Sequence, residues 1–583
     1  MMKKLSKSIV TALAVLLMTA TVPFAACAQT PAPPPGPGPV LPPEEIKPPV
    51  LDDPDKQDPV YDGSAVKVSE IVSNDFGNHI KVGGQDFLFV GTQIRVDALM
   101  NCDKLDYGKI ELLFAEAAKL GVTCVQIPVE WAKMEIAQDV FDYTYLYKMM
   151  TFANKYNLKM EFLWYGTNMC GDTHSYTVPD YILRDGRTYP KFDALRTGEF
   201  WNFYGIMWYL DFDNENLIAR ETNAVEKMME YIYEYDSTHG AKKPVIGIQI
   251  LNEPDIFVRY RIGKYNVLSR ETGQTMTAEE GYTKVCNSLN ALGKAVKKSN
   301  YQVYTRVNLA ASTKGDNQNS SGNGVYDGAE VKDAPTFATR MQALEGIDII
   351  GDDCYMSGVK NVKGITSMYA EKIPNNFGHV AENDGNYANT ASLILAAVSQ
   401  HGGYSIYDLL TPPFYVANDA ADIDQGIIKY ADDTYGAFTY KNHYPQVQSL
   451  IAGLKAVDFE VYNLDNDDFI CFNVASDYAE QEIAQTISST NVTVAFSTSA
   501  GALGFALDMG GHLDVYVTAD ATLSLSNGTI SAVKSGVYAD GVFNGNAVSV
   551  QNGTVRLTPN MLYRIEYNSA GKIQSTTWDN IGG

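Results

Sequence analysis

The sequence contains few of the residues that bind metals or build disulfide scaffolds. Its 583 residues include only seven histidines and seven cysteines. These are dispersed, without a CxxC pair, an HExxH motif or another ligand spacing. Cys124 lies in an apolar, strand-like run and Cys286 in a helix-like one, which predicts buried free thiols. We therefore expect no catalytic metal and no cofactor.

Basic residues are also scarce. Lys and Arg number 45 against 69 Asp and Glu, which gives a formal net charge of −24. A surface of this sign argues against nucleic acid and against anionic lipid as binding partners. It suits a neutral, uncharged substrate instead.

Only one long apolar run is present, and it lies at the N-terminus. Lysines precede the apolar residues 9–18, and small residues follow up to residue 28, which predicts an export signal over residues 1–28. Residues 24–27 (FAAC) are close to a lipoprotein box, in which a lipidated Cys27 would attach the protein to a membrane. Residues 26–28 (ACA) also fit plain cleavage and secretion. We expect an exported protein, and favour a cell-surface lipoprotein over a secreted form.

The rest of the chain divides into a linker and at least two domains. Residues 29–66 are rich in proline, which predicts an extended, semi-rigid linker. The following residues are too many for one compact core, and their pattern changes near residue 456. Alternating apolar residues and Asn-Gly turns after that point predict a β-sandwich over residues 457–583. This domain could brace its neighbour or bind carbohydrate; we favour bracing because no aromatic-rich face stands out.

Residues 67–456 are expected to form a (β/α)8 barrel, or TIM barrel, of the α/β class. Short apolar runs alternate there with amphipathic helical segments, and eight alternations favour a closed barrel. An open doubly wound sheet would require a Gly-rich phosphate loop after the first strand, and the sequence has none. The predicted strands are residues 87–90, 122–127, 159–164, 245–251, 303–307, 347–350, 377–381 and 404–407.

Two glutamates follow predicted strands at the end where barrels place their active groups. Glu253 follows the fourth strand within the sequence Asn252-Glu253-Pro254, and Glu382 follows the seventh. These strands lie roughly across the barrel mouth, so the two carboxyl groups can approach one sugar from opposite faces. Glycoside cleavage needs such a pair, one carboxyl as acid and the other as nucleophile or base. A separation of about 5–5.5 Å would predict retention of configuration, and about 6.5–9.5 Å inversion.

Three segments resemble a known enzyme group. Residues 249–254 (QILNEP), 131–143 (WAKMEIAQDVFDY) and 178–183 (VPDYIL) resemble clan A glycoside hydrolases, most of all the β-galactosidase-type families 35 and 42, with some likeness to family 5. The likeness covers about residues 86–410 and is strongest over 120–255. It implies that Glu253 is the acid/base, that Asn252 binds the sugar 2-hydroxyl, and that Glu382 is the nucleophile.

Further residues are candidates for the same site. Tyr355, past the sixth strand, is expected to orient the nucleophile, and Trp131 and Trp164 are candidates for stacking on sugar or for core packing. Family 5 proteins have an arginine where this chain has Gln126, and Arg95 or Arg306 could supply that charge. The alternatives to Glu382 as nucleophile are Asp352, Asp353 and Asp384.

The leading functional hypothesis is a retaining glycoside hydrolase that cleaves a β-linked sugar, with an exo-acting β-galactosidase as the specific candidate. The alternatives are an endo-acting β-glycanase on the same scaffold and a catalytically silent, glycan-binding surface lipoprotein. The presence of both glutamates favours an enzyme. The expected partner is an oligo- or polysaccharide, and the sequence leaves the oligomeric state open.

Overall fold

A computed structural model describes most of the chain after the proline-rich segment. The predicted export signal, Cys27 and Arg95 lie outside the described residues. No helix in the described part of the chain is both long and apolar enough to span a membrane. The described residues are 47–94, 96, 107–167, 177–194, 208–255, 267–268, 276–309, 340–355, 357–385, 387–407, 444–473, 492–497, 501–526, 528–539 and 541–569.

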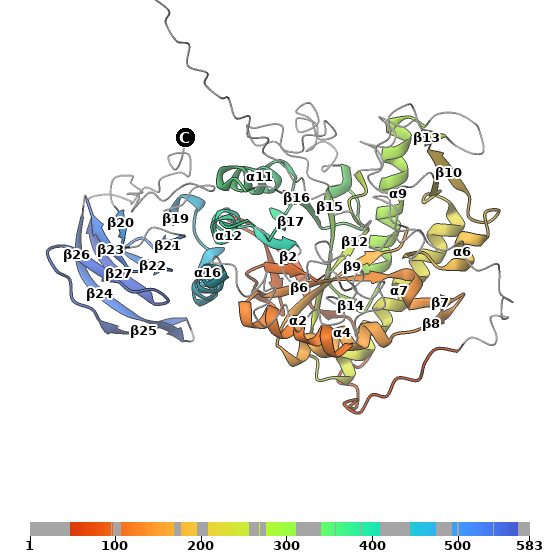
Figure 1. Ribbon diagram of the computed structural model, residues 1–583, viewed down its shortest axis with the longest axis horizontal. Helices are drawn as coiled ribbons and strands as arrows, with labels where there is room; N and C mark the ends of the chain where they lie inside the picture. Colours follow the sequence, from red (N-terminus) through yellow and green to blue (C-terminus); the bar gives the residue numbers. More distant parts are fainter. Residues whose placement is uncertain are drawn as a thin grey trace, which may run out of the picture.

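Eight parallel strands close into a barrel, which confirms the predicted fold class (Figure 1). Each strand pairs with its neighbour in parallel register, and the eighth strand in the chain pairs with the first. The strands in chain order are β5 (Val90–Gln93), β6 (Cys124–Glu130), β9 (Lys159–Tyr165), β12 (Val245–Ile250), β15 (Tyr304–Leu309), β16 (Ile349–Asp353), β17 (His379–Asp384) and β18 (Gly403–Tyr407).

Helices between the strands cover the outside of the barrel. The longest, α7, begins at an Asn214 cap whose side chain accepts two backbone N–H groups. The helix α9 begins with a capping box in which Thr277 and Glu280 satisfy each other's backbone donors, a motif that fixes a helix start. The main helices are α2 (Tyr107–Leu120), α4 (Thr144–Lys155), α7 (Glu215–Thr238), α9 (Ala278–Lys297), α11 (Val359–Lys372), α12 (Thr390–Val398) and α16 (Tyr444–Ala456).

Three strands begin two residues later, and end three residues later, than the apolar runs predicted. They are β6, β16 and β17. Hydropathy detects only the apolar middle of such a strand, whereas the last residues at the barrel mouth are polar and still belong to the ladder. Asp353 and Glu382 are therefore strand residues that pair with each other across β16 and β17.

Polar residues also fill part of the barrel interior. Arg306 on β15 donates two hydrogen bonds to Glu161 on β9, of 2.9 and 2.6 Å, and both side chains are essentially inaccessible to solvent. Gln126 on β6 donates to the same carboxylate at 2.7 Å. Because β12 lies between β9 and β15, this ion pair passes over β12 on the inner face. The position of Gly247 on β12 leaves room for the ring of Tyr304.

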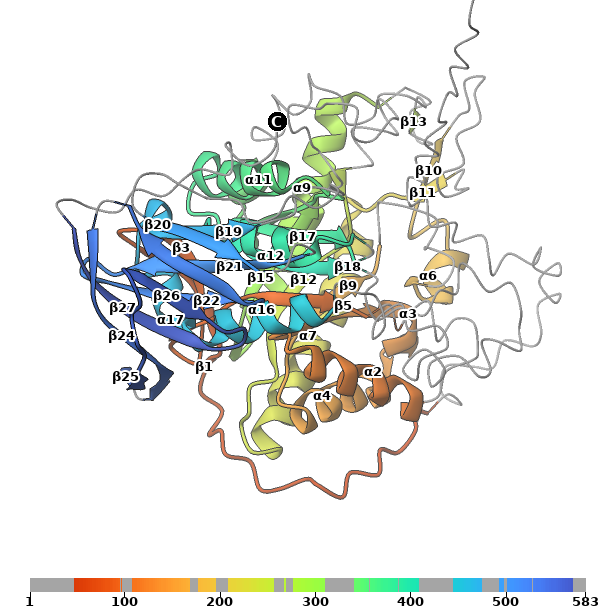
Figure 2. The same ribbon diagram turned by 60° about the vertical axis from the view of Figure 1, so that its left-hand side comes forward.

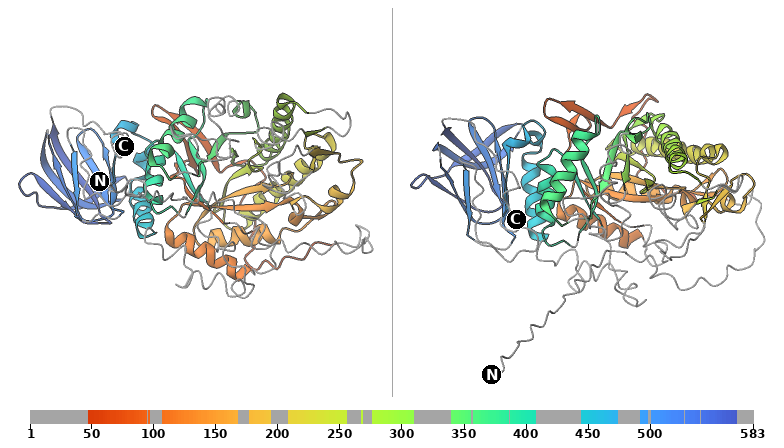
Figure 3. Two further views of the ribbon diagram at one scale, coloured as in Figure 1. Left: turned by 45° about the horizontal axis from the view of Figure 1, so that its top comes forward. Right: turned by 90° about the horizontal axis from the view of Figure 1, so that it is seen from above.

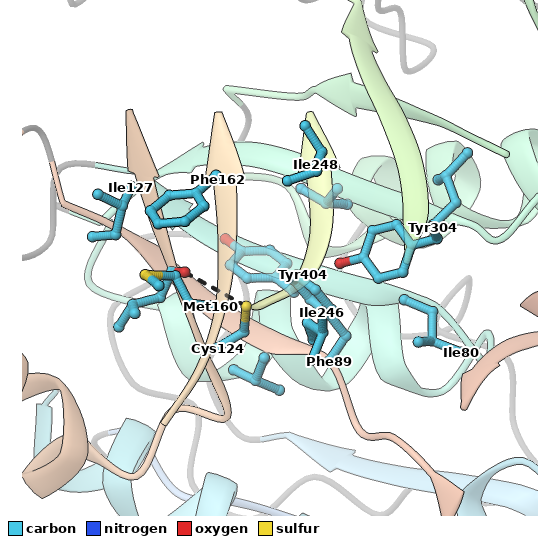
Figure 4. Close-up of a cluster of buried hydrophobic side chains, with 14 of the residues drawn as sticks. Ile80, Phe89, Cys124, Ile127, Met160, Phe162, Ile246, Ile248, Tyr304 and Tyr404 are labelled. Atoms are coloured by element: carbon cyan, nitrogen blue, oxygen red, sulfur yellow. Dashed lines mark hydrogen bonds between the residues drawn. The ribbon is translucent and has the colours of Figure 1, made fainter. Parts of the chain in front are cut away.

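The apolar core surrounds these strands. Figure 4 shows Cys124, Phe162, Ile248 and Tyr404 on four different strands of this core. All four are buried, as expected for strands covered on both faces. Cys124 is a buried free thiol, as predicted, whereas the free thiol of Cys286 on α9 is only partly buried.

Four smaller sheets lie outside the barrel. β2, β3 and β4 form a three-stranded antiparallel sheet, and β1 pairs in parallel with β14. The other two sheets, β7 with β8 and β10 with β11 and β13, lie in the segments between barrel strands. Their bounds are β1 (Val66–Lys67), β2 (Ser69–Asn74), β3 (Gly77–Val82), β4 (Gln85–Asp86), β7 (Glu135–Ala137), β8 (Val140–Phe141), β10 (Lys191–Ala194), β11 (Trp208–Leu210), β13 (Val267–Leu268) and β14 (Tyr301–Gln302), with short helices α3 (Trp131–Met134) and α6 (Asp180–Arg184).

The last part of the predicted linker is extended but bound to the barrel. The backbone N–H groups of Gln57 and Val60 donate to the carbonyls of Thr238 and Ser237 at the end of α7, at 2.9 and 3.0 Å. Asp53 accepts hydrogen bonds from Tyr147 and His239.

The C-terminal domain consists of two antiparallel sheets, as the predicted sandwich requires. The larger sheet has six strands and the smaller has three, and a second apolar core lies between them. The six are β19 (Phe469–Asn473), β21 (Leu503–Asp508), β22 (His512–Val517), β27 (Leu562–Ser569), β24 (Gly528–Ala539) and β25 (Val542–Ala547), and the three are β20 (Val492–Phe496), β23 (Ala521–Leu525) and β26 (Thr554–Leu557).

The outer face of the large sheet packs on the barrel. Phe505 and Tyr516 of this sheet belong to the same buried cluster as Leu450 and Leu454 of α16 and the barrel core. The helix α16 lies between the sheets and the barrel in Figure 2 and in both views of Figure 3. The two domains therefore share a continuous apolar core.

A partly buried polar cluster lies at this domain interface. Tyr538 on β24 donates its hydroxyl to Glu460 at 2.5 Å, and Glu460 belongs to α17 (Asp458–Val461) next to the barrel. The same tyrosine contacts Asp514 on β22, which Arg564 binds through two hydrogen bonds of 3.1 and 2.9 Å. Burial, together with the charge of Asp514, raises the pKa of Glu460 to about 7.

The free energy of unfolding should therefore fall as the pH rises from 4.5 to about 7. The folded chain keeps a proton on Glu460 that the unfolded chain releases above the ordinary pKa of 4.5, so stability is present at low pH and is lost towards pH 7. We expect Glu460→Gln to reduce the loss between pH 4.5 and 7 by about 2 kcal/mol, measured by denaturant titration at each pH. The exposed Glu566 on β27 provides the control, and Glu566→Gln should leave the pH dependence unchanged. An equal slope in all three proteins would contradict the assignment.

Candidate active site

Glu382 and Tyr355 form a hydrogen-bonded pair at the barrel mouth. Glu382 is buried on β17, and the Tyr355 hydroxyl donates to its Oε2 at 2.5 Å. Tyr355 itself is held by Tyr387, whose hydroxyl donates to the Tyr355 carbonyl at 3.0 Å. It also contacts Tyr407, at the end of β18, with ring centroids 5.7 Å apart. Tyr355 thus orients one carboxylate oxygen of Glu382, and contacts with Tyr387 and Tyr407 hold Tyr355 itself in place.

Glu253 lies in a tight turn directly after β12. Leu251 and Glu253 both have a positive φ, of 61° and 43°, a conformation that non-glycine residues rarely adopt without support. The support comes from Asn308 near the end of β15, whose Oδ1 accepts the Glu253 backbone N–H at 3.1 Å. The Asn308 amide also donates to Asn252 Oδ1 at 3.0 Å, which leaves the Asn252 amide N–H groups to point elsewhere.

The charges of Glu382 and Glu253 both act on the hydroxyl of Tyr355. Burial raises the pKa of the Tyr355 hydroxyl well above its ordinary value, and the charge of Glu382 raises it further. The charges of Asp353 and Glu253 act on this hydroxyl in the same direction. Glu253 and Glu382 therefore belong to one cluster, although they come from strands on different sides of the barrel.

The two tryptophans that are candidates for the site lie in the protein interior. Trp131 and Trp164 are each 0% exposed. The indole N–H of Trp131 donates to Glu135 at 2.6 Å, and that of Trp164 donates to the buried Glu221 at 2.9 Å. Neither indole presents a face to solvent, so their environment favours core packing over sugar stacking.

The other charged candidates are also bound to neighbours. Arg306 is paired with Glu161 inside the barrel, below the mouth, so its charge is largely compensated there. Asp352 accepts a hydrogen bond of 2.9 Å from Tyr369 on α11, which directs it to the helix layer, whereas Asp353 bonds to Asn308 at 2.7 Å. Asp353 also belongs to the cluster, because its charge acts on the Tyr355 hydroxyl.

Sequence reasoning missed Asn308 and Tyr407. Both are polar residues at the ends of barrel strands, which is the signal that could have identified them. The fifth apolar run ends at residue 307, so the hydropathy pattern does not mark Asn308. Among the described residues, no group of three or more His, Cys, Asp or Glu side chains is arranged to hold a metal ion.

Fold and site together describe a TIM barrel with carboxyl groups at the C-terminal ends of its strands. A sequence-family model described as "Domain of unknown function (DUF4978)" matches residues 284–479. This segment contains Asn308, Asp353 and Glu382 and does not include Glu253. No curated protein matches the sequence.

Several solved structures are similar to this chain. An endo-1,4-β-mannanase from Rhizomucor miehei is 13% identical with a TM-score of 0.40, and the match covers 65% of this chain and 99% of that one. An endo-β-1,4-mannanase from Thermotoga petrophila is 9% identical with a TM-score of 0.41, covering 85% and 98%. A family 39 glycoside hydrolase from Bacteroides cellulosilyticus WH2 is 12% identical with a TM-score of 0.40, covering 84% of each chain. Those activities belong to the proteins named.

Proposed function

We propose that the protein is a retaining glycoside hydrolase that cleaves a β-linked sugar, with Glu253 as acid/base and Glu382 as nucleophile. The observation that carries this proposal is the cluster at the mouth, in which both glutamates act on Tyr355 and Tyr355 binds Glu382. Paired carboxyl groups of this kind are the machinery of glycoside cleavage.

The contacts suggest a role for each group. Tyr355 donates to Oε2 of Glu382 and so orients the carboxylate that attacks the anomeric carbon. Glu253 gives its proton to the leaving oxygen as the glycosidic bond breaks, and later takes a proton from the water that releases the sugar. Asn252, whose Oδ1 is occupied by Asn308, directs its amide N–H groups to the sugar 2-hydroxyl.

The resemblance to families 35 and 42 makes a β-galactoside the first substrate to test. Purified protein would be offered a panel of aryl β-glycosides and β-linked polysaccharides, and the first-formed anomer would be followed by NMR. We expect cleavage with the β-anomer formed first, and release of only monosaccharide if the enzyme is exo-acting. A mixture of oligosaccharides would identify an endo-acting glycanase. The α-anomer as first product would contradict the proposed mechanism, and binding of glycans without cleavage would contradict the enzyme.

A further inference from the structure

Asp353 is a third carboxyl group of the site, and the proposed reaction assigns it no role. It ends β16, is 0% exposed, and lies opposite Glu382 in the β16–β17 ladder. Its Oδ2 accepts the amide of Asn308 at 2.7 Å. Its Oδ1 is buried and accepts no hydrogen bond from an N–H or O–H group among the described residues.

The Asn308 amide joins Asp353 to the turn that carries Glu253. Its Oδ1 accepts the Glu253 backbone N–H, while its Nδ2 donates both to Asp353 and to Asn252. One planar amide thus fixes Asp353 and the strained turn relative to each other. The two carboxyl groups lie close enough to share a side-chain hydrogen bond.

Such a contact requires a proton, because two ionised carboxylates are both acceptors and repel each other. The charged groups around Asp353 favour Asp353 as the residue that carries this proton. Burial raises the pKa of Asp353 well above its ordinary value, and the charges of Glu382, Glu253 and Asp352 raise it further. The charges of Arg306 and Asp353 also act on each other, but Arg306 is already bound to Glu161 through two hydrogen bonds.

We propose that Asp353 is a positioning residue that stays protonated and donates its carboxyl O–H to the carboxylate of Glu253. This inference rests on the proposed function, since it concerns the acid/base of that reaction. When Glu253 gives its proton to the leaving oxygen, the resulting carboxylate receives the Asp353 hydrogen bond. When Glu253 takes a proton from water in the second step, Asp353 has kept its own. Asp353 acts as an uncharged donor throughout, with Asn308 bound to its other oxygen.

An uncharged donor can be replaced by an amide of the same shape. Asparagine at position 353 can accept from Asn308 through its oxygen and donate to Glu253 through its nitrogen, whereas leucine can do neither. We expect Asp353→Leu to lower kcat/KM by about 10- to 100-fold, the usual effect of losing a hydrogen bond to a charged group. Its basic pH limit should move up by about one unit, because the Glu253 carboxylate loses a donor. Asp353→Asn should restore most of the activity and the original pH profile.

The experiment compares pH–rate profiles of the wild type, both Asp353 variants and Asp348→Asn. Asp348 lies just before β16, at the other end of the barrel, where it bonds to Thr305, and its variant should keep the wild-type profile. A basic limit that moves down in Asp353→Asn would show that Asp353 is ionised and would overturn the proposal. Unchanged profiles in both Asp353 variants would also overturn it.

A measurement without substrate tests this inference separately from the proposed function. It also keeps the inference testable if Asp353→Leu does not fold. The infrared difference spectrum between wild type and Asp353→Asn at neutral pH should contain the carbonyl band of a protonated carboxyl group. Absence of this band would refute the protonated Asp353 whatever the activity. If the band is present but Glu253→Gln and Glu382→Gln remain fully active, the proposed function fails and the protonated carboxyl group stands.

Discussion

Glu382→Ala is expected to lower kcat/KM on the best aryl β-glycoside by about 10⁴-fold or more. Glu382 is the carboxylate that Tyr355 fixes at 2.5 Å, and no other described carboxyl group has this contact. Without it the anomeric carbon has no nucleophile, and both steps of the reaction lose their covalent intermediate. Steady-state kinetics would measure the loss, with mass spectrometry of a mechanism-based inhibitor locating the labelled residue.

Glu253→Ala is expected to affect the two steps of the reaction unequally. A substrate with a good leaving group needs no acid, so its first step should continue while the release of the sugar slows. Added azide should restore turnover and give a glycosyl azide of β-configuration, whereas azide with Glu382→Ala should give the α-configuration. Glu230→Ala, which removes an exposed carboxylate on α7, is the control and should leave kcat/KM unchanged. Activity that survives Glu382→Ala would move the nucleophile to another residue, such as Asp353.

The second large effect concerns stability. Glu161→Ala should lower the free energy of unfolding of the barrel by about 3–5 kcal/mol. The substitution leaves the Arg306 guanidinium buried at 1% side-chain exposure without the carboxylate that receives two of its hydrogen bonds. An uncompensated charge in the interior is far more costly than the loss of the pair itself. Chemical denaturation followed by tryptophan fluorescence would measure the change, because Trp131 and Trp164 are both in the barrel.

Two further variants test the physical reason. Glu161→Leu combined with Arg306→Met replaces the ion pair by apolar side chains and should recover much of the lost stability. The exposed pair of Lys227 and Glu230 on α7 gives the matched comparison, and Glu230→Ala should change stability by less than about 1 kcal/mol. If Glu161→Ala is no more destabilising than Glu230→Ala, the interior pair does not have the role inferred from its burial.

The sequence predicted the fold because a barrel repeats one local pattern. Each strand needs an apolar run, each helix an apolar face, and hydropathy reports both, so all eight strands were found. It reports the polar ends of strands poorly, which is why β16 and β17 extend three residues beyond their predicted ends. Asp353 and Glu382 are among the residues affected.

The site could be predicted only where a motif marks it. Asn252 and Glu253 are neighbours in a recognisable segment, but their partner Asn308 lies 55 residues from Glu253, and no local pattern connects them. The tryptophans show a second limit of sequence reasoning, because an aromatic residue near a strand end can face the site or the core. The buried carboxylates that bind the indoles, Glu135 and Glu221, are recognisable only in three dimensions.

The continuous core between the large C-terminal sheet and α16 bears on how this protein can be cut or recombined. A shortened chain that ends after the barrel would leave Leu450 and Leu454 of α16 without the Phe505 and Tyr516 side chains that share their core. An uncovered apolar surface of this kind favours aggregation. The C-terminal sheets therefore cannot be exchanged as an independent domain. A fusion of these sheets to another barrel would have to include α16 and the surface against which it packs.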